Sequence, residues 1–191
     1  MNIGIDLDGV VYDSERLFRT YAEFFDVEIK GGGVVKSDEV RVQKRYNWPE
    51  GAFDKFLNSC LLKIEKQACL MPFVKECMIK LKEMGHKLII ISSRGCNDKK
   101  EEQIAIKRIK KDKLPIDKIC FGQFSKLKAC REEQIDIMID DYDVIVKELA
   151  DNNIHCLYFK DGGIKKVEHK NIEMVRSWGE VYKKFLEYKE N

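Results

Sequence analysis

The amino-acid sequence predicts an α/β fold, a doubly wound parallel sheet with helices on both faces. The first observation is a repeat: from Pro72 onward, short apolar strands alternate with amphipathic helices, the pattern of βαβ units. The second is an interruption: residues 2–5 have the pattern of a buried strand, but residues 14–70 contain no convincing core strand. We therefore expect a catalytic core of residues 1–13 and 71–191, and a helical cap insertion of residues 14–70.

The insertion is expected to hold two helices separated by an irregular segment. Apolar residues recur at helical spacing after Asp13 and again after Pro49. Gly31–Gly33 interrupts the segment between them. The expected apolar face of the first helix comprises Leu17, Phe18, Tyr21, Phe24 and Phe25, and that of the second comprises Phe53, Phe56, Leu57, Cys60, Leu61 and Ile64.

The core repeat places further strands at residues 87–91, 118–121, 135–139 and 155–159. Helices separate these strands. The first carries Phe73 to Met84 and stops at Gly85, and the last begins at a capping box of Ser177 and Glu180. Right-handed crossovers distribute such helices over both faces of the sheet. Ligands of doubly wound sheets bind beyond the carboxyl ends of the strands.

Composition narrows the class of protein. The 191 residues suffice for one domain with a modest insertion, and 35 basic against 33 acidic residues give a net charge of +2. This balance predicts no nucleic-acid polymer and no anionic membrane as partner. Seven cysteines without a C-x-x-C pair indicate free thiols in a reducing compartment. With no signal peptide and no long apolar run, we expect a cytoplasmic protein. The oligomeric state is not readable from the sequence.

Six oxygen-bearing side chains stand where three of the predicted strands end. Each pair alone has a plainer explanation, because Asp and Ser commonly cap turns and helices. Together they bring four carboxylates to one edge of the sheet, where these would repel one another without a cation. Hard oxygen ligands of this kind suit Mg²⁺ together with a substrate phosphate. The pairs are Asp6 with Asp8, Ser92 with Ser93, and Asp140 with Asp141.

Two basic residues are candidates for contact with a phosphate. Lys126 lies near the start of a predicted helix, where a cation is unfavourable unless an anion lies nearby. Its rival Lys128 would point to the opposite side of that helix. Arg94 either reaches the phosphate or forms a salt bridge at the start of the next helix. Tyr12, Phe18, Tyr46 and Trp48 are expected to pack within the cap, with stacking on a nucleobase as the alternative.

The sequence resembles phosphatases of the haloacid dehalogenase superfamily, whose four motifs have counterparts here in order. They are Asp6-Leu7-Asp8-Gly9-Val10, then Ser92, then Lys126, then Asp140-Asp141. The stretches around Glu83–Arg94 and Lys126–Asp141 resemble the 5'(3')-deoxyribonucleotidase-like branch. Ser93 departs from that branch, where Ala is common. The resemblance implies a sheet order of 3-2-1-4-5 with a cap inserted after the first strand.

The resemblance also implies roles for the site residues. Asp6 would be the nucleophile that forms an aspartyl-phosphate, and Asp8 the general acid and base. Mg²⁺ would be held by Asp6, the backbone carbonyl of Asp8, and Asp141. Phosphate would be bound by Ser92, Ser93 and Lys126, with Asp140 and Arg94 in supporting positions.

We therefore expect a Mg²⁺-dependent phosphatase for a small phosphorylated substrate, with a 5'- or 3'-(deoxy)nucleotide as first choice. A phosphatase for a sugar phosphate or another metabolite is the alternative. A phosphotransferase would differ in how its cap excludes water. A catalytically inactive binding module is disfavoured by the intact set of Asp6, Asp8, Lys126 and Asp141.

Overall fold

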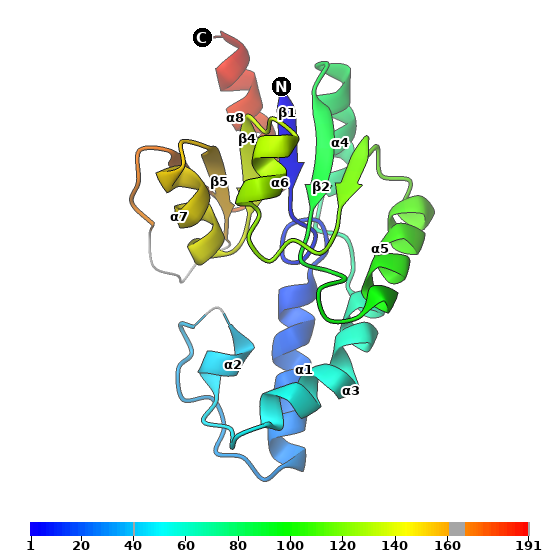
Figure 1. The fold of residues 1–191 in the computed structure, drawn as a ribbon, viewed down its shortest axis with the longest axis vertical. Coiled ribbons are helices and arrows are strands. Elements are labelled where there is room, and N and C mark those ends of the chain that lie inside the picture. Colours follow the sequence, from blue (N-terminus) through cyan, green and yellow to red (C-terminus); the bar gives the residue numbers. More distant parts are fainter. Residues whose placement is uncertain (40, 161–166, 191) are drawn as a thin grey trace.

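The structure is a computed structural model that describes residues 1–39, 41–160 and 167–190. Its centre is a parallel sheet in the order β3-β2-β1-β4-β5-β6 (Figure 1). The expected order of the first five strands is confirmed, and β6 is an addition at the edge. The strands are β1 (Asn2–Ile5), β2 (Lys87–Ile91), β3 (Lys118–Cys120), β4 (Ile137–Asp140), β5 (His155–Phe159) and β6 (Ile172–Val175).

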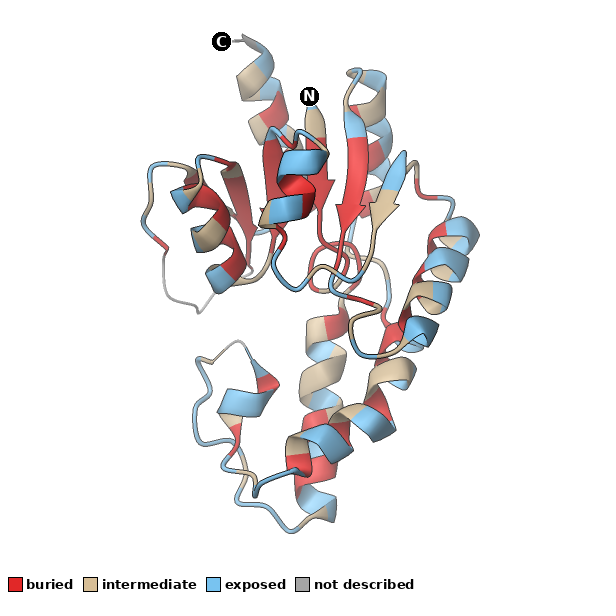
Figure 2. Ribbon diagram, viewed as in Figure 1, coloured by how far each residue is buried: buried red, intermediate tan, exposed pale blue. Residues whose placement is uncertain are grey.

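Helices cover both faces of the sheet, as expected for a doubly wound fold. The apolar cluster on one face joins strand residues to α4 (Val74–Glu83), α5 (Lys99–Asp112) and α8 (Trp178–Glu190). The cluster on the other face joins them to α6 (Leu127–Glu132) and α7 (Asp143–Asp151). Figure 2 shows the consequence: β1, β2 and β4 are buried almost throughout, whereas β3 is only partly covered.

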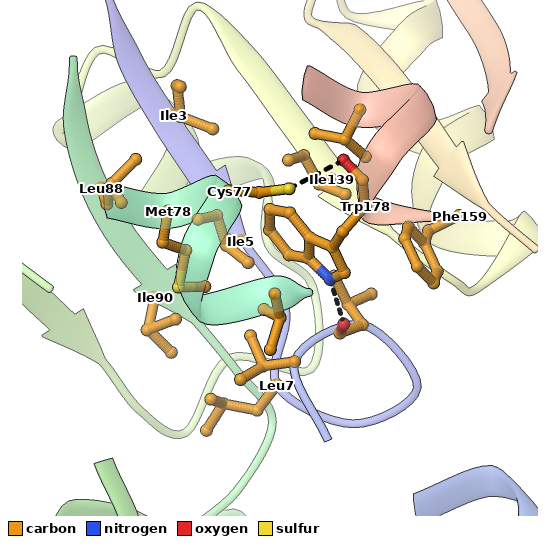
Figure 3. Packing of buried hydrophobic residues seen from close by; sticks show 14 of the residues in the cluster. Ile3, Ile5, Leu7, Cys77, Met78, Leu88, Ile90, Ile139, Phe159 and Trp178 are labelled. Carbon is orange, nitrogen blue, oxygen red and sulfur yellow. Dashed lines mark hydrogen bonds between the residues drawn. The ribbon is translucent and has the colours of Figure 1, made fainter. Parts of the chain in front are cut away.

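Trp178 ties the last helix to the loop that follows the first strand. Its fully buried ring packs among apolar side chains of β1, α4 and β5 (Figure 3). The indole Nε1 donates a hydrogen bond of 2.8 Å to the carbonyl of Val10, and the Cys77 thiol donates to the carbonyl of Trp178 at 3.3 Å. Because buried carbonyls need partners, the contact with Val10 helps fix the loop that carries Asp6 and Asp8.

The inserted segment lies beyond the carboxyl ends of the strands (Figure 1). It contains α1 (Ser14–Glu28), the short α2 (Val42–Arg45) and α3 (Ala52–Gln67). Its helices bury an apolar cluster of their own, which includes Phe25 and Phe56. The sequence predicted α1 and α3; α2 was missed because four residues are too few to show a helical period.

Several local predictions are wrong at the ends of elements. Phe24 and Phe73 were expected on apolar faces but are 70% and 72% exposed. Phe73 precedes α4 at a φ of 60°, so its side chain leaves the helical stripe. At α8, Ser177 accepts from the amide of Glu180 as expected, but the Glu180 carboxylate accepts from the amide of Arg176 and not that of Ser177.

Two further observations concern the cysteines and the helices. All seven thiols are free. Among the described residues, no helix combines the length and the apolar character needed to cross a membrane.

Candidate active site

Three acidic side chains meet where β1 and β4 end side by side. Asp6 directly follows β1, Asp140 is the last residue of β4, and Asp141 follows it. The Asp6 amide donates to the carbonyl of Ile139 at 3.0 Å, which extends the pairing of the two strands to the site. Each of the three carboxylates offers an oxygen within 4.8 Å of the other two. The predicted gathering of Asp6, Asp140 and Asp141 is therefore present in the structure.

Lys126 lies between two of these carboxylates. Its Nζ is 2.6 Å from Asp6 Oδ1 and 2.6 Å from Asp140 Oδ2. Burial would lower the pKa of Lys126, but the charges of Asp140 and Asp6 outweigh it and raise the pKa above its usual value. The ammonium therefore stays charged. Lys128 is 82% exposed and pairs with Glu132, so only Lys126 of the two rivals faces the acidic cluster.

The acidic cluster carries more negative charge than Lys126 offsets. Burial, opposed by Lys126 and reinforced by Asp140, raises the pKa of Asp6 to about 7. Burial likewise raises the pKa of Asp141 well above its usual value, although Lys160 Nζ lies 3.5 Å from Asp141 Oδ2. A divalent cation would restore both carboxylates to the ionised form, and carboxylate oxygens are the ligands that Mg²⁺ prefers. The residues present therefore fit a magnesium ion.

Gly9 makes room for the acidic cluster. Its φ is +78°, a backbone conformation that L-residues with a side chain rarely adopt. A Cβ atom at this position would lie 2.1 Å from Asp141 Oδ2, closer than any real contact. The glycine in the first motif is therefore required twice, once for the turn and once for the approach of Asp141.

Asp8 and Arg94 form a bidentate ion pair. Arg94 Nε lies 2.8 Å from Asp8 Oδ2, and Nη2 lies 2.7 Å from Oδ1. Burial would raise the pKa of Asp8, but the charge and hydrogen bonds of Arg94 hold it below its usual value. Of the two roles considered for Arg94, the salt bridge is therefore the one present, although its partner comes from the loop after β1 and not from the helix that follows Arg94.

The two serines differ in their positions. Ser92 is fully buried, and its hydroxyl accepts a hydrogen bond from the Arg94 amide at 3.2 Å. It shapes the turn after β2 and is not among the residues that line the cavity beside the site. Ser93 is exposed and does line that cavity. The backbone turn at Ser92 thus presents Ser93 to the space in front of Asp6.

A cavity of about 690 Å³ lies between the strand ends and the inserted segment. Asp6, Asp8 and Lys126 line its core side. Of the four aromatic residues that were considered for stacking on a nucleobase, only Phe18 lines the cavity. Tyr12 is buried in the core, and Tyr46 stacks on Trp48 inside the insertion at 4.7 Å between ring centroids. The insertion contributes Ser14, Glu15, Phe18, Arg41, Val42, Gln43, Phe53, Leu57, Leu61 and Glu65 to the wall.

Sequence reasoning missed three charged residues at the site. Lys160 directly follows β5, just as Asp6 directly follows β1, so its position at a strand end could have identified it as a site residue. Its Nζ is 2.5 Å from Glu15 Oε2 and holds that carboxylate near Asp141. Glu15 and Glu65 lie on helices of the insertion, where nothing in the local sequence separates them from ordinary surface residues.

The raised pKa of Asp6 predicts a pH dependence of stability in metal-free protein. Between the usual pKa of 3.8 and about 7, the folded chain holds a proton that the unfolded chain has released. Stability therefore falls as pH rises through this range. In EDTA, the free energy of unfolding of the wild type should fall relative to Asp6→Asn by roughly 1 to 3 kcal/mol between about pH 5 and about pH 8.

Denaturant titrations at several pH values measure this difference. The asparagine variant, which cannot ionise, is the matched control for the titrating groups that do not interact with Asp6. A wild type that gains stability relative to Asp6→Asn as pH rises would contradict the charge arrangement described above.

Comparisons with known proteins concern the fold. No protein-family model matches the chain, and no curated protein matches it significantly. Among solved structures, a predicted phosphatase from Clostridium acetobutylicum superposes with a TM-score of 0.68 at 19% identity, over 97% of this chain and 98% of that one. A haloacid dehalogenase-like hydrolase from Streptococcus pneumoniae gives 0.67 at 17% identity, over 96% and 97%.

A third structure was solved with a phosphorylated sugar. CbbY from Rhodobacter sphaeroides, in complex with xylulose-1,5-bisphosphate, gives a TM-score of 0.61 at 12% identity, over 94% of this chain and 95% of that one. These likenesses extend over nearly the whole chain, insertion included. They do not single out the nucleotidase-like branch. The chain has the α/β fold of the haloacid dehalogenase-like hydrolases.

Proposed function

We propose that the protein is a Mg²⁺-dependent phosphomonoesterase that works through a phosphorylated aspartate. The observation that carries this proposal is the pairing of Asp6 with Lys126 at 2.6 Å inside an acidic cluster that opens on a cavity. A carboxylate that a bound divalent cation would keep ionised, beside a lysine that can offset charge on phosphoryl oxygens, is suited to attack phosphorus.

In this proposal, Asp6 attacks the phosphorus atom of the bound ester. Lys126, held between Asp6 and Asp140, contacts the transferring phosphoryl group and offsets its charge. Ser93 binds the remaining phosphoryl oxygens through its hydroxyl and its backbone amide. Asp140 positions Lys126, since one of its oxygens accepts from Lys126 Nζ and the other from the Tyr142 amide at 2.9 Å.

Asp8 is proposed to move the protons. It would give a proton to the leaving oxygen and later accept one from the water that hydrolyses the phosphorylated Asp6. The ion pair with Arg94 sets its direction within the site. The pair also favours the ionised form of Asp8, which serves the second, base-catalysed half of the reaction and opposes proton donation in the first.

Asp6, Asp141 and the backbone carbonyl of Asp8 are proposed to hold Mg²⁺. When bound, the ion supplies positive charge that keeps Asp6 ionised and offsets the phosphate charge. Lys160 Nζ lies 3.5 Å from Asp141 Oδ2 and also pairs with Glu15. Free thiols throughout support a reducing, cytoplasmic location.

We propose that residues 14–70 act as a cap that selects the leaving group. The insertion has its own apolar cluster and faces the cavity with apolar residues of α1 and α3, Phe18, Phe53, Leu57 and Leu61. Such a wall favours a leaving group with an apolar ring face, which supports a (deoxy)nucleotide as substrate. The alternative is a sugar phosphate or a similar metabolite, favoured by the sugar bisphosphate that CbbY binds in the same fold.

Purified protein supplied with Mg²⁺ should release phosphate from a panel of nucleoside monophosphates and sugar phosphates, and EDTA should stop the release. The apolar cap wall predicts larger kcat/KM for nucleotides. Asp6→Asn is the control for contaminating phosphatases, because it keeps the size of the nucleophile and should lose activity about 10³-fold or more. Preference for sugar phosphates over every nucleotide would replace the first-choice substrate with the alternative.

The two lysines at the start of α6 offer a matched pair of variants. Lys126→Ala should lower kcat/KM by about 10²-fold or more, because it removes the charge beside Asp6. Lys128→Ala should change activity less than about twofold, since this side chain points to solvent. Steady-state kinetics on the same ester measure both. Equal losses in the two variants would show that Lys126 has no special role.

A further inference from the structure

A second charge cluster adjoins the acidic site, and one of its members, Glu65, has no role in the proposed reaction. Its centre is Arg94, which is 2% exposed. One edge of its guanidinium, Nε and Nη2, binds Asp8, and Glu65 Oε1 lies 3.5 Å from Arg94 Nε. The third nitrogen, Nη1, has no hydrogen-bond partner among the described residues. Arg94 therefore joins two carboxylates that come from different parts of the chain.

Glu65 is the carboxylate that the inserted segment contributes. It lies near the end of α3, is 2% exposed, and lines the cavity together with Asp8. Its Oε2 is buried without a partner in the described part of the chain. Burial, only partly offset by Arg94, raises the pKa of Glu65 to about 8. A carboxylate placed only for stability would be expected to have both oxygens satisfied.

The surrounding contacts hold α3 beside Arg94. Arg108 of α5 donates to the backbone carbonyls of Glu65 and Lys66 at 3.2 and 3.0 Å, which secures the end of α3 against α5. Asp8 and Arg94 both lie in loops, after β1 and β2 respectively. Among the described side chains, Arg94 makes ion pairs only with Asp8 and Glu65. The position of α3 therefore bears on Arg94, and through it on Asp8.

We propose that Glu65 is a positioning residue for Asp8 that acts through Arg94. In this arrangement, the cap helix α3 sets the direction of the guanidinium, and the guanidinium aims the Asp8 carboxyl group at the leaving oxygen. The inference rests on the proposed phosphatase function. It adds that the inserted segment takes part in proton delivery as well as in selecting the leaving group.

A misdirected Asp8 has a particular kinetic signature. An alkyl phosphate expels a strongly basic oxygen and needs a well-placed proton donor, whereas p-nitrophenyl phosphate expels a stable phenolate and needs little help. A misplaced Asp8 carboxyl group therefore lowers kcat/KM for the alkyl ester more than for the aryl ester. General damage to the fold or to the metal site lowers both together.

The experiment compares kcat/KM for glycerol phosphate and p-nitrophenyl phosphate in the wild type and in Glu65→Gln, with Mg²⁺ present. The glutamine keeps the shape of the side chain, cannot ionise, and puts an amide in place of the carboxyl group beside Arg94. We expect the alkyl-to-aryl ratio to fall about 10-fold or more. Glu65→Asp, which keeps the carboxylate but withdraws it by one methylene, is the second variant and should give an intermediate ratio.

Two control variants distinguish the effect of the Glu65 side chain from that of other changes in or around α3. Arg108→Gln loosens the end of α3 without altering the Glu65 side chain, and Asp54→Asn removes an exposed carboxylate from the same helix. Asp54→Asn should leave the ratio unchanged, and Arg108→Gln should change it less than Glu65→Gln. Thermal unfolding verifies that each variant is folded under assay conditions.

The outcomes are distinguishable. An active wild type with the same alkyl-to-aryl ratio in folded Glu65→Gln and Glu65→Asp overturns this inference and leaves the proposed function standing. A ratio that falls as far in Asp54→Asn as in Glu65→Gln also overturns it, because any loss of a carboxylate from α3 would then suffice. A wild type inactive toward both esters overturns the proposed function and this inference with it.

Discussion

The structure depends on how buried negative charge is compensated at one edge of the sheet. Parallel pairing of β1 with β4 forces Asp6, Asp140 and Asp141 together, and burial makes each ionised carboxylate costly. Lys126 offsets part of the charge through its contact with Asp6, and Lys160 offsets part of it through its contact with Asp141. The negative charge that remains uncompensated makes the site suited to a divalent cation. It also suits a reaction in which a carboxylate loses its charge by forming a covalent bond.

The framework serves to keep these charges in place. In the loop after β1, the Val10 carbonyl accepts a hydrogen bond from the indole of Trp178, which belongs to the C-terminal helix α8. Next to the acidic cluster, Gly9 allows Asp141 to approach the same loop. The loop is thus fixed between a rigid core and the acidic cluster, an arrangement that limits reorganisation during reaction. The contact of Arg94 with Glu65 extends this support to the inserted segment.

Sequence patterns were sufficient for the core and for the residues at the strand ends. Alternation of strands and helices predicted the sheet, and strand-end aspartates with Lys126 predicted the cluster. The strand β6 was not predicted because Glu173 interrupts the apolar run of a short edge strand. The pairing of Arg94 with Asp8, and the part played by Glu65, depend on how loops and α3 pack in space, which no local period encodes. Lys160 could have been found by applying the strand-end rule to β5 as well.

The central claim is that Asp6 becomes phosphorylated during turnover, and acid quenching tests it most directly. The protein is mixed with Mg²⁺ and a hydrolysed ester, quenched in acid within the first turnover, and digested, and the peptide that contains Asp6 and Asp8 is analysed by tandem mass spectrometry. If Asp6 is the nucleophile, we expect a mass increase of one phosphoryl group on Asp6, which is absent when the ester is omitted. A phosphoryl group on Asp8 instead, or rapid turnover with no phosphorylated peptide at any quench time, would contradict it.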